Sequence, residues 1–210
     1  MSSSDIILKI LTLGESSVGK SSIIRRFTNN KFSEQFLTTV GVDFKSKIIS
    51  YRNKKVKVLL VDTSGQDRFR NIANNYYRSA DGILLVFDVS KKMSIEKFDL
   101  WIQQINEKWS SDNNSILLFG NKIDCVNDRE ISNEEGKQLA EKYKMVYVEG
   151  SALTGEGINE GIELLVEKII KHKRLLEDEE SNLSTTIHLK YKSKKKHARE
   201  EEEQVNAKCC

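Results

Sequence analysis

The chain has no proline and only three cysteines among its 210 residues, and it lacks a long hydrophobic run. Without proline, its turns have to be made with glycine, asparagine, aspartate or serine. Cys209 and Cys210 are the last two residues, which excludes a disulfide-based scaffold and indicates a reducing compartment. The longest apolar stretch, 82–87, is too short to span a bilayer, and residues 1–5 lack the basic start of a signal peptide.

An excess of charge of one sign is also missing. Lys and Arg number 34 and Asp and Glu 31, a net charge of +3, which argues against a uniformly basic nucleic-acid-binding protein. Like charges gather only near the end, in an acidic block at 177–180, a basic block at 190–199 and an acidic block at 200–203. Such blocks bury too little apolar surface to fold alone. We therefore predict a folded domain over 1–175 and a flexible tail over 176–210.

Short apolar runs alternate with amphipathic segments through the folded part. Most runs are continuous, which is typical of strands covered on both faces, while residues 42–51 alternate and could pair with 55–61 as an antiparallel hairpin. This alternation predicts an α/β domain with a doubly wound, mostly parallel sheet. The expected strands are 6–13, 42–51, 56–61, 82–87, 115–119 and 145–148, and the expected helices are 20–27, 95–109, 133–143 and 158–170.

A glycine-rich loop between the first expected strand and helix matches the phosphate-binding P-loop pattern. Its backbone N–H groups would curl around phosphate oxygens, helped by the N-terminal end of the helix. Lys20 would bridge the β- and γ-phosphates, and Ser21 would bind Mg²⁺. The expected phosphate-binding residues here are Gly14, Glu15, Ser16, Ser17, Val18, Gly19, Lys20, Ser21 and Ser22.

Two further segments complete the expected phosphate site. Asp62 follows a strand and is expected to hold Mg²⁺ through water, Gly65 to bring its N–H to the γ-phosphate, and Gln66 to orient the attacking water. From the residues alone, Thr38 and Thr39 are both plausible further ligands of Mg²⁺.

A second group of residues follows the later strands and has the chemistry to read a purine base. Asp124 can accept from guanine N1–H and its 2-amino group, whereas adenine offers neither donor. Lys122 can lay its stem along the base, Asn121 is expected to tie this loop to the P-loop, and the Ala152 N–H can donate to guanine O6. The expected guanine-binding residues are Asn121, Lys122, Asp124, Ser151, Ala152 and Leu153.

Together these motifs resemble those of the Rab family of small GTPases, within the Ras superfamily. Rab-like strings stand at 40–44, 57–61, 68–72, 76–80 and 85–89, and the resemblance covers 6–170 and the Cys-Cys end. It implies a P-loop NTPase G domain, with a six-stranded sheet that has one antiparallel edge strand. It selects Thr39 as the switch threonine and implies a GTP/GDP switch in vesicle traffic with slow hydrolysis.

The resemblance also implies partners and a location. It predicts an exchange factor, an activating protein, effectors, a GDP-dissociation inhibitor and an escort protein, with the chain itself a monomer. Two prenyl groups on Cys209 and Cys210 would anchor it to the cytoplasmic face of an endomembrane, beside a soluble cytosolic pool. The basic block at 190–199 could add attraction to anionic lipid, opposed by the glutamates at 200–203.

Five positions depart from the family pattern, one of them Ser64, which stands where an alanine is usual. Val61 stands where a tryptophan usually joins Phe44 and Tyr77 in a surface that effectors read. Phe32 replaces a tyrosine and loses a hydroxyl, Leu153 replaces a lysine, and Asp67 replaces a glutamate after Gln66.

Three other functions fit parts of the pattern. A nucleotide-loaded membrane scaffold with negligible hydrolysis is the main alternative, because Phe32 and the altered second switch leave room for it. A small-molecule kinase or ATPase would share the P-loop but not the base-reading residues at 121–124. A nucleic-acid-binding protein would use the basic tail, which the nearly neutral domain disfavours.

Overall fold

The computed structural model describes residues 6–33, 39, 41–65, 70–109 and 115–173. The chain separates into two units, Met1–Ile169 and Ile170–Cys210. In the second unit, residues 170–173 are described and are helical. The expected boundary after residue 175 and the tail over 176–210 lie outside the described residues and stay predictions. Within the described ranges, no helix combines the length and the apolar character that crossing a membrane requires.

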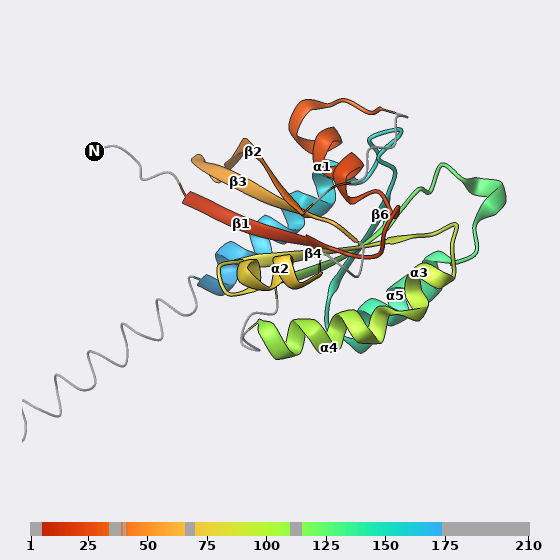
Figure 1. Ribbon diagram of the computed structural model, residues 1–210. Coiled ribbons are helices and arrows are strands. Elements are labelled where there is room, and N and C mark those ends of the chain that lie inside the picture. The colour runs from red at the N-terminus through yellow and green to blue at the C-terminus, as the bar shows by residue number, and fades with distance from the viewer. Residues whose placement is uncertain (1–5, 34–38, 40, 66–69, 110–114, 174–210) are drawn as a thin grey trace, which may run out of the picture. The chain divides into compact units, whose positions relative to one another are not determined.

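The first unit is built on one sheet of six strands in the order β2-β3-β1-β4-β5-β6 (Figure 1). Neighbouring strands are parallel except β2 and β3, which pair antiparallel from Val42 opposite Thr63 to Tyr51 opposite Lys54. This confirms the predicted fold class. The strands are β1 (Ile6–Leu13), β2 (Val42–Tyr51), β3 (Lys54–Thr63), β4 (Gly82–Asp88), β5 (Ile116–Asn121) and β6 (Val146–Gly150).

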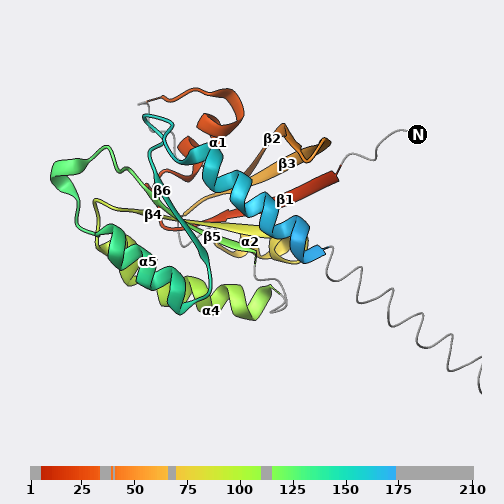
Figure 2. The same cartoon turned by 180° about the vertical axis from the view of Figure 1, so that it is seen from behind.

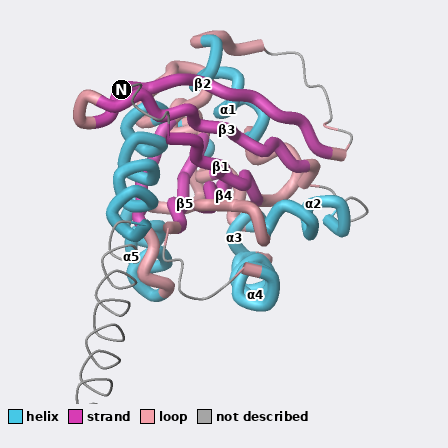
Figure 3. Tube along the Cα trace, turned by 90° about the vertical axis from the view of Figure 1, so that its left-hand side faces the viewer, coloured by secondary structure: helices cyan, strands magenta, loops and turns pink. Residues whose placement is uncertain are grey.

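Burial along each strand follows its place in the sheet. Every residue of the central strand β4 is buried, as its continuous apolar sequence requires for a strand covered on both faces. The edge strand β2 has no buried residue, which explains its alternating and more polar sequence. Figure 3 shows β2 and β3 side by side at this edge of the sheet.

Helices cover both faces of the sheet (Figures 1 and 2). Helices α4 and α5 lie on one side, and α1 lies on the other together with the helical residues 158–169 of the first unit. Apolar side chains of α4 pack in one core cluster with those of β1, β4 and β5. The bounds are α1 (Lys20–Asn29), α2 (Arg70–Tyr77), α3 (Met93–Glu96), α4 (Phe98–Lys108) and α5 (Asn133–Lys142).

The helix expected over 95–109 is in fact two helices, and this part of the prediction is wrong. The first begins at Met93, and the helical path is interrupted at Lys97, where φ is −89° and ψ is 10°. The hydroxyl of Ser94 explains the early start, because it donates to the Asp88 carbonyl at 2.9 Å and accepts from the Asp88 N–H at 3.2 Å. These bonds tie α3 to the end of β4.

Turns in this proline-free chain use more residue types than expected. Arg52 and Asn53 connect β2 to β3 with φ values of 45° and 63°, a left-handed pair that suits a tight hairpin. Lys122 and Lys144 also have positive φ, so lysine joins glycine and asparagine at such positions. The tertiary contacts of Lys122, described below, compensate for this strain.

The position of β1 determines where a ligand can bind. It lies between β3 and β4, so the chain leaves β1 at the point where the strand order reverses. Parallel sheets bind ligands in the crevice outside the carboxyl ends of their strands at such a point. The P-loop follows β1 there, and the loops after β3, β5 and β6 meet it.

Candidate nucleotide site

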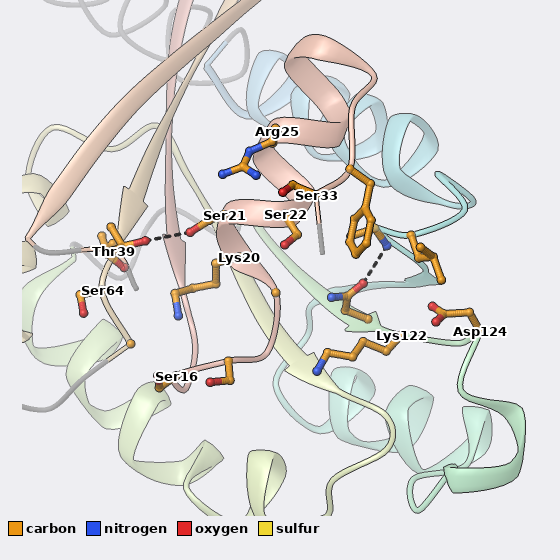
Figure 4. Close-up of a pocket in the computed structure, with 18 residues that line it drawn as sticks. Ser16, Lys20, Ser21, Ser22, Arg25, Ser33, Thr39, Ser64, Lys122 and Asp124 are labelled. Carbon is orange, nitrogen blue, oxygen red and sulfur yellow. Dashed lines mark hydrogen bonds between the residues drawn. The ribbon is translucent and has the colours of Figure 1, made fainter. Parts of the chain in front are cut away.

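A cavity of about 410 Å³ opens at this edge of the sheet (Figure 4). It is lined from the P-loop and α1, from the switch residues and the end of β3, and from the loops after β5 and β6. The cavity therefore unites most of the residues expected to bind phosphate with those expected to bind the base, apart from Ser151, which does not line it. The lining residues are Ser16, Ser17, Gly19, Lys20, Ser21, Ser22, Arg25, Phe32, Ser33, Thr39, Thr63, Ser64, Gly65, Asn121, Lys122, Asp124, Ala152 and Leu153.

The P-loop makes a turn that few residues other than glycine tolerate. Gly14 has a φ of 135°, and a Cβ built there would stand 2.2 Å from the Val86 carbonyl oxygen. Gly19 has a φ of 99°, and its Cβ would stand 2.2 Å from the Asn121 amide nitrogen. Only glycine fits these approaches without a shift of the neighbouring atoms.

Lys20 is almost fully buried at the centre of the loop. Its Nζ donates to the carbonyl oxygens of Gly14 and Glu15 at 3.0 and 2.8 Å. The ammonium is thereby held at the loop, where it can also reach a phosphate. Gly65 approaches the same point, since a Cβ there would lie 2.5 Å from both Lys20 Nζ and the Glu15 carbonyl oxygen. Gln66, the next residue, lies outside the described residues, and its role stays a prediction.

Three oxygen-bearing side chains have the chemistry of a magnesium site. The hydroxyls of Ser21 and Thr39 lie 2.9 Å apart, which brings the first switch to the start of α1. Asp62 is buried, and its Oδ1 has no hydrogen-bond partner among the residues that the structure describes. Burial raises the pKa of Asp62, and the nearby Ser21 hydroxyl and Lys20 ammonium offset this only in part. A buried carboxylate oxygen without a partner, beside two hydroxyls, fits a hard divalent cation.

Asn121 connects the two halves of the site. Its amide nitrogen donates to the Val18 carbonyl in the P-loop at 2.8 Å, which is the tie that we expected. Its Oδ1 accepts from the Ala152 N–H at 3.1 Å. The Ala152 N–H was expected to donate to guanine O6. With a base bound, this N–H would therefore donate to both Asn121 Oδ1 and guanine O6.

The other base-site residues also interact with one another. Asp124 accepts a hydrogen bond from the Ser151 hydroxyl, which leaves Ser151 a structural partner of the carboxylate. Lys122 has a φ of 73°, and its Nζ lies 2.6 Å from Oδ2 of the buried Asp88. This ion pair fixes the stem of Lys122 across the cavity. Leu153 lines the cavity and remains 45% exposed.

Sequence reasoning missed Arg26, which holds the loop after β6. The guanidinium donates through Nε to the Ala152 carbonyl at 2.9 Å and through Nη2 to the Leu153 carbonyl. Helix α1 therefore supports the base end of the site as well as the phosphate end. The contact joins residues 126 positions apart, and no local pattern in the sequence indicates it.

Glu15 was expected among the phosphate-binding residues, but its side chain turns away from the cavity. Its carboxylate accepts from the Trp101 indole N–H at 3.1 Å and lies 3.4 Å from Lys97 Nζ. Only the backbone of Glu15 faces the site. Its side chain instead fixes the P-loop against α4.

The expected effector surface needs a correction. Phe44 is 46% exposed, but Val61 and Tyr77 are 2% and 1% exposed and belong to the core cluster. Val61 and Tyr77 are therefore unavailable for direct contact in this structure. The exposed Phe44 instead contacts the partly buried Tyr76, and the two ring centroids lie 5.5 Å apart at an angle of 64°.

Some expected functional residues cannot be placed. Thr38, Gln66, Asp67, Cys209 and Cys210 lie outside the described residues. Thr39, the switch threonine that the resemblance selects, is described and meets Ser21 as stated above.

Comparisons with known proteins agree with this geometry. The model of the Ras family matches residues 9–171. The chain is 43% identical to Ras-related protein Rab-18 of Lymnaea stagnalis over 182 residues, which cover 86% of this chain and 89% of that protein. It is 39% identical to GTP-binding protein ypt2 of Schizosaccharomyces pombe, with 88% and 92% covered, and 38% identical to Ras-related protein Rab-27B of Bos taurus, with 80% and 81% covered.

Proposed function

The chain belongs to the Ras family as a Rab small GTPase, and from this we propose that it is a slow GTP/GDP switch that regulates vesicle traffic. It hydrolyses GTP to GDP and phosphate at a low rate until an activating protein acts on it. The observation that carries this proposal is the single cavity shared by a P-loop and a guanine-reading group of side chains.

The phosphates are bound by the P-loop. Backbone N–H groups of residues 14–22 face the phosphate oxygens, and the positive end of α1 adds to their attraction. Lys20 supplies a charge-assisted contact to the β- and γ-phosphates, and the Gly65 N–H supplies one to the γ-phosphate. The close approach of Gly65 to Lys20 supports this assignment.

The residues fit a bound Mg²⁺ held by the hydroxyls of Ser21 and Thr39, with Asp62 acting through water. When bound, the cation neutralises negative charge on the phosphates. Asp62 gains the partner that its buried Oδ1 lacks. A shared cation would hold the Thr39 hydroxyl close to the Ser21 hydroxyl.

The base is read by a carboxylate and a backbone amide. Asp124 accepts from N1–H and the 2-amino group of guanine, and adenine offers this carboxylate neither donor. Ala152 donates to O6, Lys122 covers a face of the base, and Leu153 closes its outer side. Asn121 and Ser151 position these groups through the hydrogen bonds described above.

The switch works through two loops, about 29–44 and 63–78. The Ser64 N–H donates to the Gly41 carbonyl at 3.1 Å, so the loops are joined where Thr39 and Gly65 face the cavity. Loss of the γ-phosphate removes the contacts that hold Thr39 and Gly65, and the two loops then relax. Gln66 orients the attacking water, and the intrinsic rate is on the order of 10⁻⁴ to 10⁻³ per second, as in switches without an arginine finger.

The first test is the nucleotide that the purified protein carries. Denaturation followed by chromatography of the extract should give one guanine nucleotide per chain. Single-turnover hydrolysis of bound GTP should then be slow alone and fast with an activating protein. An empty protein that takes up no GTP with Mg²⁺ would refute the site. Tight binding without hydrolysis under either condition would favour the nucleotide-loaded membrane scaffold.

Membrane attachment and partners follow from family membership. We propose prenylation of Cys209 and Cys210, with the folded domain over 1–175 joined by the tail to the cytoplasmic face of an endomembrane. A GDP-dissociation inhibitor maintains a cytosolic pool, an escort protein presents the chain for prenylation, and an exchange factor and effectors act on the switch loops. The protein acts as a monomer and binds no nucleic acid.

A further inference from the structure

Arg25 places a second cationic side chain at the cavity, beside Lys20. It lies on α1 one helical turn after Ser21, and residues four apart share a face of a helix. Its side chain is half-buried and lines the cavity together with Ser33 and Thr39. In Figure 4 its guanidinium extends over the side of the cavity that holds Ser21.

Within the part of the chain that the structure describes, the Arg25 guanidinium makes no hydrogen bond and no ion pair, and Asp62 interacts with it only electrostatically. The neighbouring cations differ in this respect. Lys20 is bonded to two P-loop carbonyls, Lys122 is paired with Asp88, and Arg26 is bonded to the loop after β6. A half-buried guanidinium without a directly hydrogen-bonded anion is unfavourable, and the bound phosphates would supply that hydrogen-bonded anion.

The field of Arg25 reaches the corner where the metal-binding oxygens meet. Arg25 lines the cavity together with Ser21 and Thr39, whose hydroxyls lie 2.9 Å apart. Ser21 and Thr39 stand at the same corner. The charge of Arg25 therefore lies near the expected position of the γ-phosphate, which GTP has and GDP lacks.

We propose that Arg25 is a specificity-determining residue, whose guanidinium favours the triphosphate over the diphosphate in this cavity. The inference rests on the proposed guanine-nucleotide site and concerns its preference between nucleotide states. The physical reason is Coulombic, since a triphosphate carries more negative charge than a diphosphate and gains more from the same nearby cation. Arg25 acts on the bound state and needs no place in the hydrolysis step.

The test compares affinities for a fluorescent GDP and a fluorescent non-hydrolysable GTP analogue, with Mg²⁺ and the full chain. The variants are Arg25→Gln, which removes the charge, and Arg25→Lys, which keeps it. Arg52→Gln is the matched control, because Arg52 is exposed in the β2–β3 turn and its loss changes the net charge equally. Melting temperatures of all variants without nucleotide show whether each one is folded.

We expect Arg25→Gln to weaken the GTP analogue relative to GDP by roughly 5- to 20-fold, the range of a partly desolvated charge contact. Arg25→Lys should stay within about 2-fold of the parent, and added salt should shrink the effect of Arg25→Gln. Arg52→Gln should leave the ratio of the two affinities unchanged.

Three outcomes would overturn the inference while leaving the nucleotide site intact. One is an unchanged ratio in a folded Arg25→Gln variant, and another is an equal loss for both nucleotides. The third is a loss in Arg25→Lys as large as in Arg25→Gln, because the charge would then not be the cause. If the parent protein binds neither nucleotide, the proposed function fails as well, and the two failures are thereby distinguished.

Discussion

Glu149, on β6, illustrates how a single buried charge depends on its neighbours. Burial by itself raises the pKa of Glu149, but hydrogen bonds from Arg129, Tyr147 and Asn133 outweigh this and leave the pKa below its ordinary value. The carboxylate is thus more stable in the folded chain than in the unfolded chain. Its contribution to stability is present above pH 4.5 and is lost as the pH falls through the lowered pKa.

Glu149→Gln is therefore predicted to lower the free energy of unfolding at pH 7 by about 1–3 kcal/mol, the worth of hydrogen bonds to a charged group. The difference from the parent should be constant between pH 6 and 7 and should shrink below pH 4.5. Urea denaturation at each pH measures it. Glu163→Gln, at an exposed position, is the control and should show little change at any pH. A difference as large at pH 4 as at pH 7 would contradict the mechanism.

Gln66 is the residue on which the rate of hydrolysis is predicted to depend. Gln66→Leu removes the amide that orients the attacking water, so hydrolysis should slow by at least about 10-fold. Binding of GTP should be retained, because the phosphates are held by other groups. Single-turnover decay of bound GTP measures the rate, and a decay equal to that of the parent would exclude Gln66 from the mechanism.

Among the elements, α1 is the one on which the whole site depends. It begins at Lys20, offers Ser21 and Arg25 to the phosphate side, and supports the base loop through Arg26. Its apolar face, with Ile23, Ile24 and Phe27, is buried and keeps these side chains in register. A substitution on α1 should therefore change nucleotide affinity in a way that depends on whether the side chain lies near the phosphates or near the base.

Arg26→Ala is predicted to weaken GDP and the GTP analogue equally, by about 10-fold, because the loop that it holds meets the base and not the phosphates. Arg26→Lys should restore only part of the affinity, since a single ammonium cannot reproduce a planar fork that donates to two carbonyls. Fluorescent-nucleotide titration measures both. A loss confined to the GTP analogue would mean that Arg26 acts through the switch loops instead.

At the scale of the whole molecule, the main prediction is that the domain is independent of its tail. A chain ending at residue 175 should keep its melting temperature within about 3 °C and its affinity for GDP, because the charged blocks beyond it bury little apolar surface. It should lose attachment to vesicles after treatment with the prenylation machinery. Thermal melting and vesicle flotation measure these effects against the full chain. A fall in melting temperature of about 10 °C would show that the tail is part of the fold.

Much of this architecture was predictable because its signals are local. Apolar runs predicted five of the strands to within two residues at either end, and the alternation of residues 42–51 predicted the sixth, the antiparallel edge strand. The early start of the helix at Met93 was not predictable, because it depends on the bonds of Ser94 to the end of β4. An amphipathic pattern alone does not contain that contact.

The sequence by itself determined the fold class, the place of the P-loop after β1 and the order of the motifs around the site, because spacing and residue type along the chain are sufficient for these. Only the tertiary structure decided that Glu15 turns toward Trp101, that Val61 and Tyr77 are buried, and that Arg25 faces the cavity. These outcomes depend on which surfaces meet when helices pack on the sheet. Packing brings together residues that are far apart in the chain, and local sequence patterns do not predict such contacts.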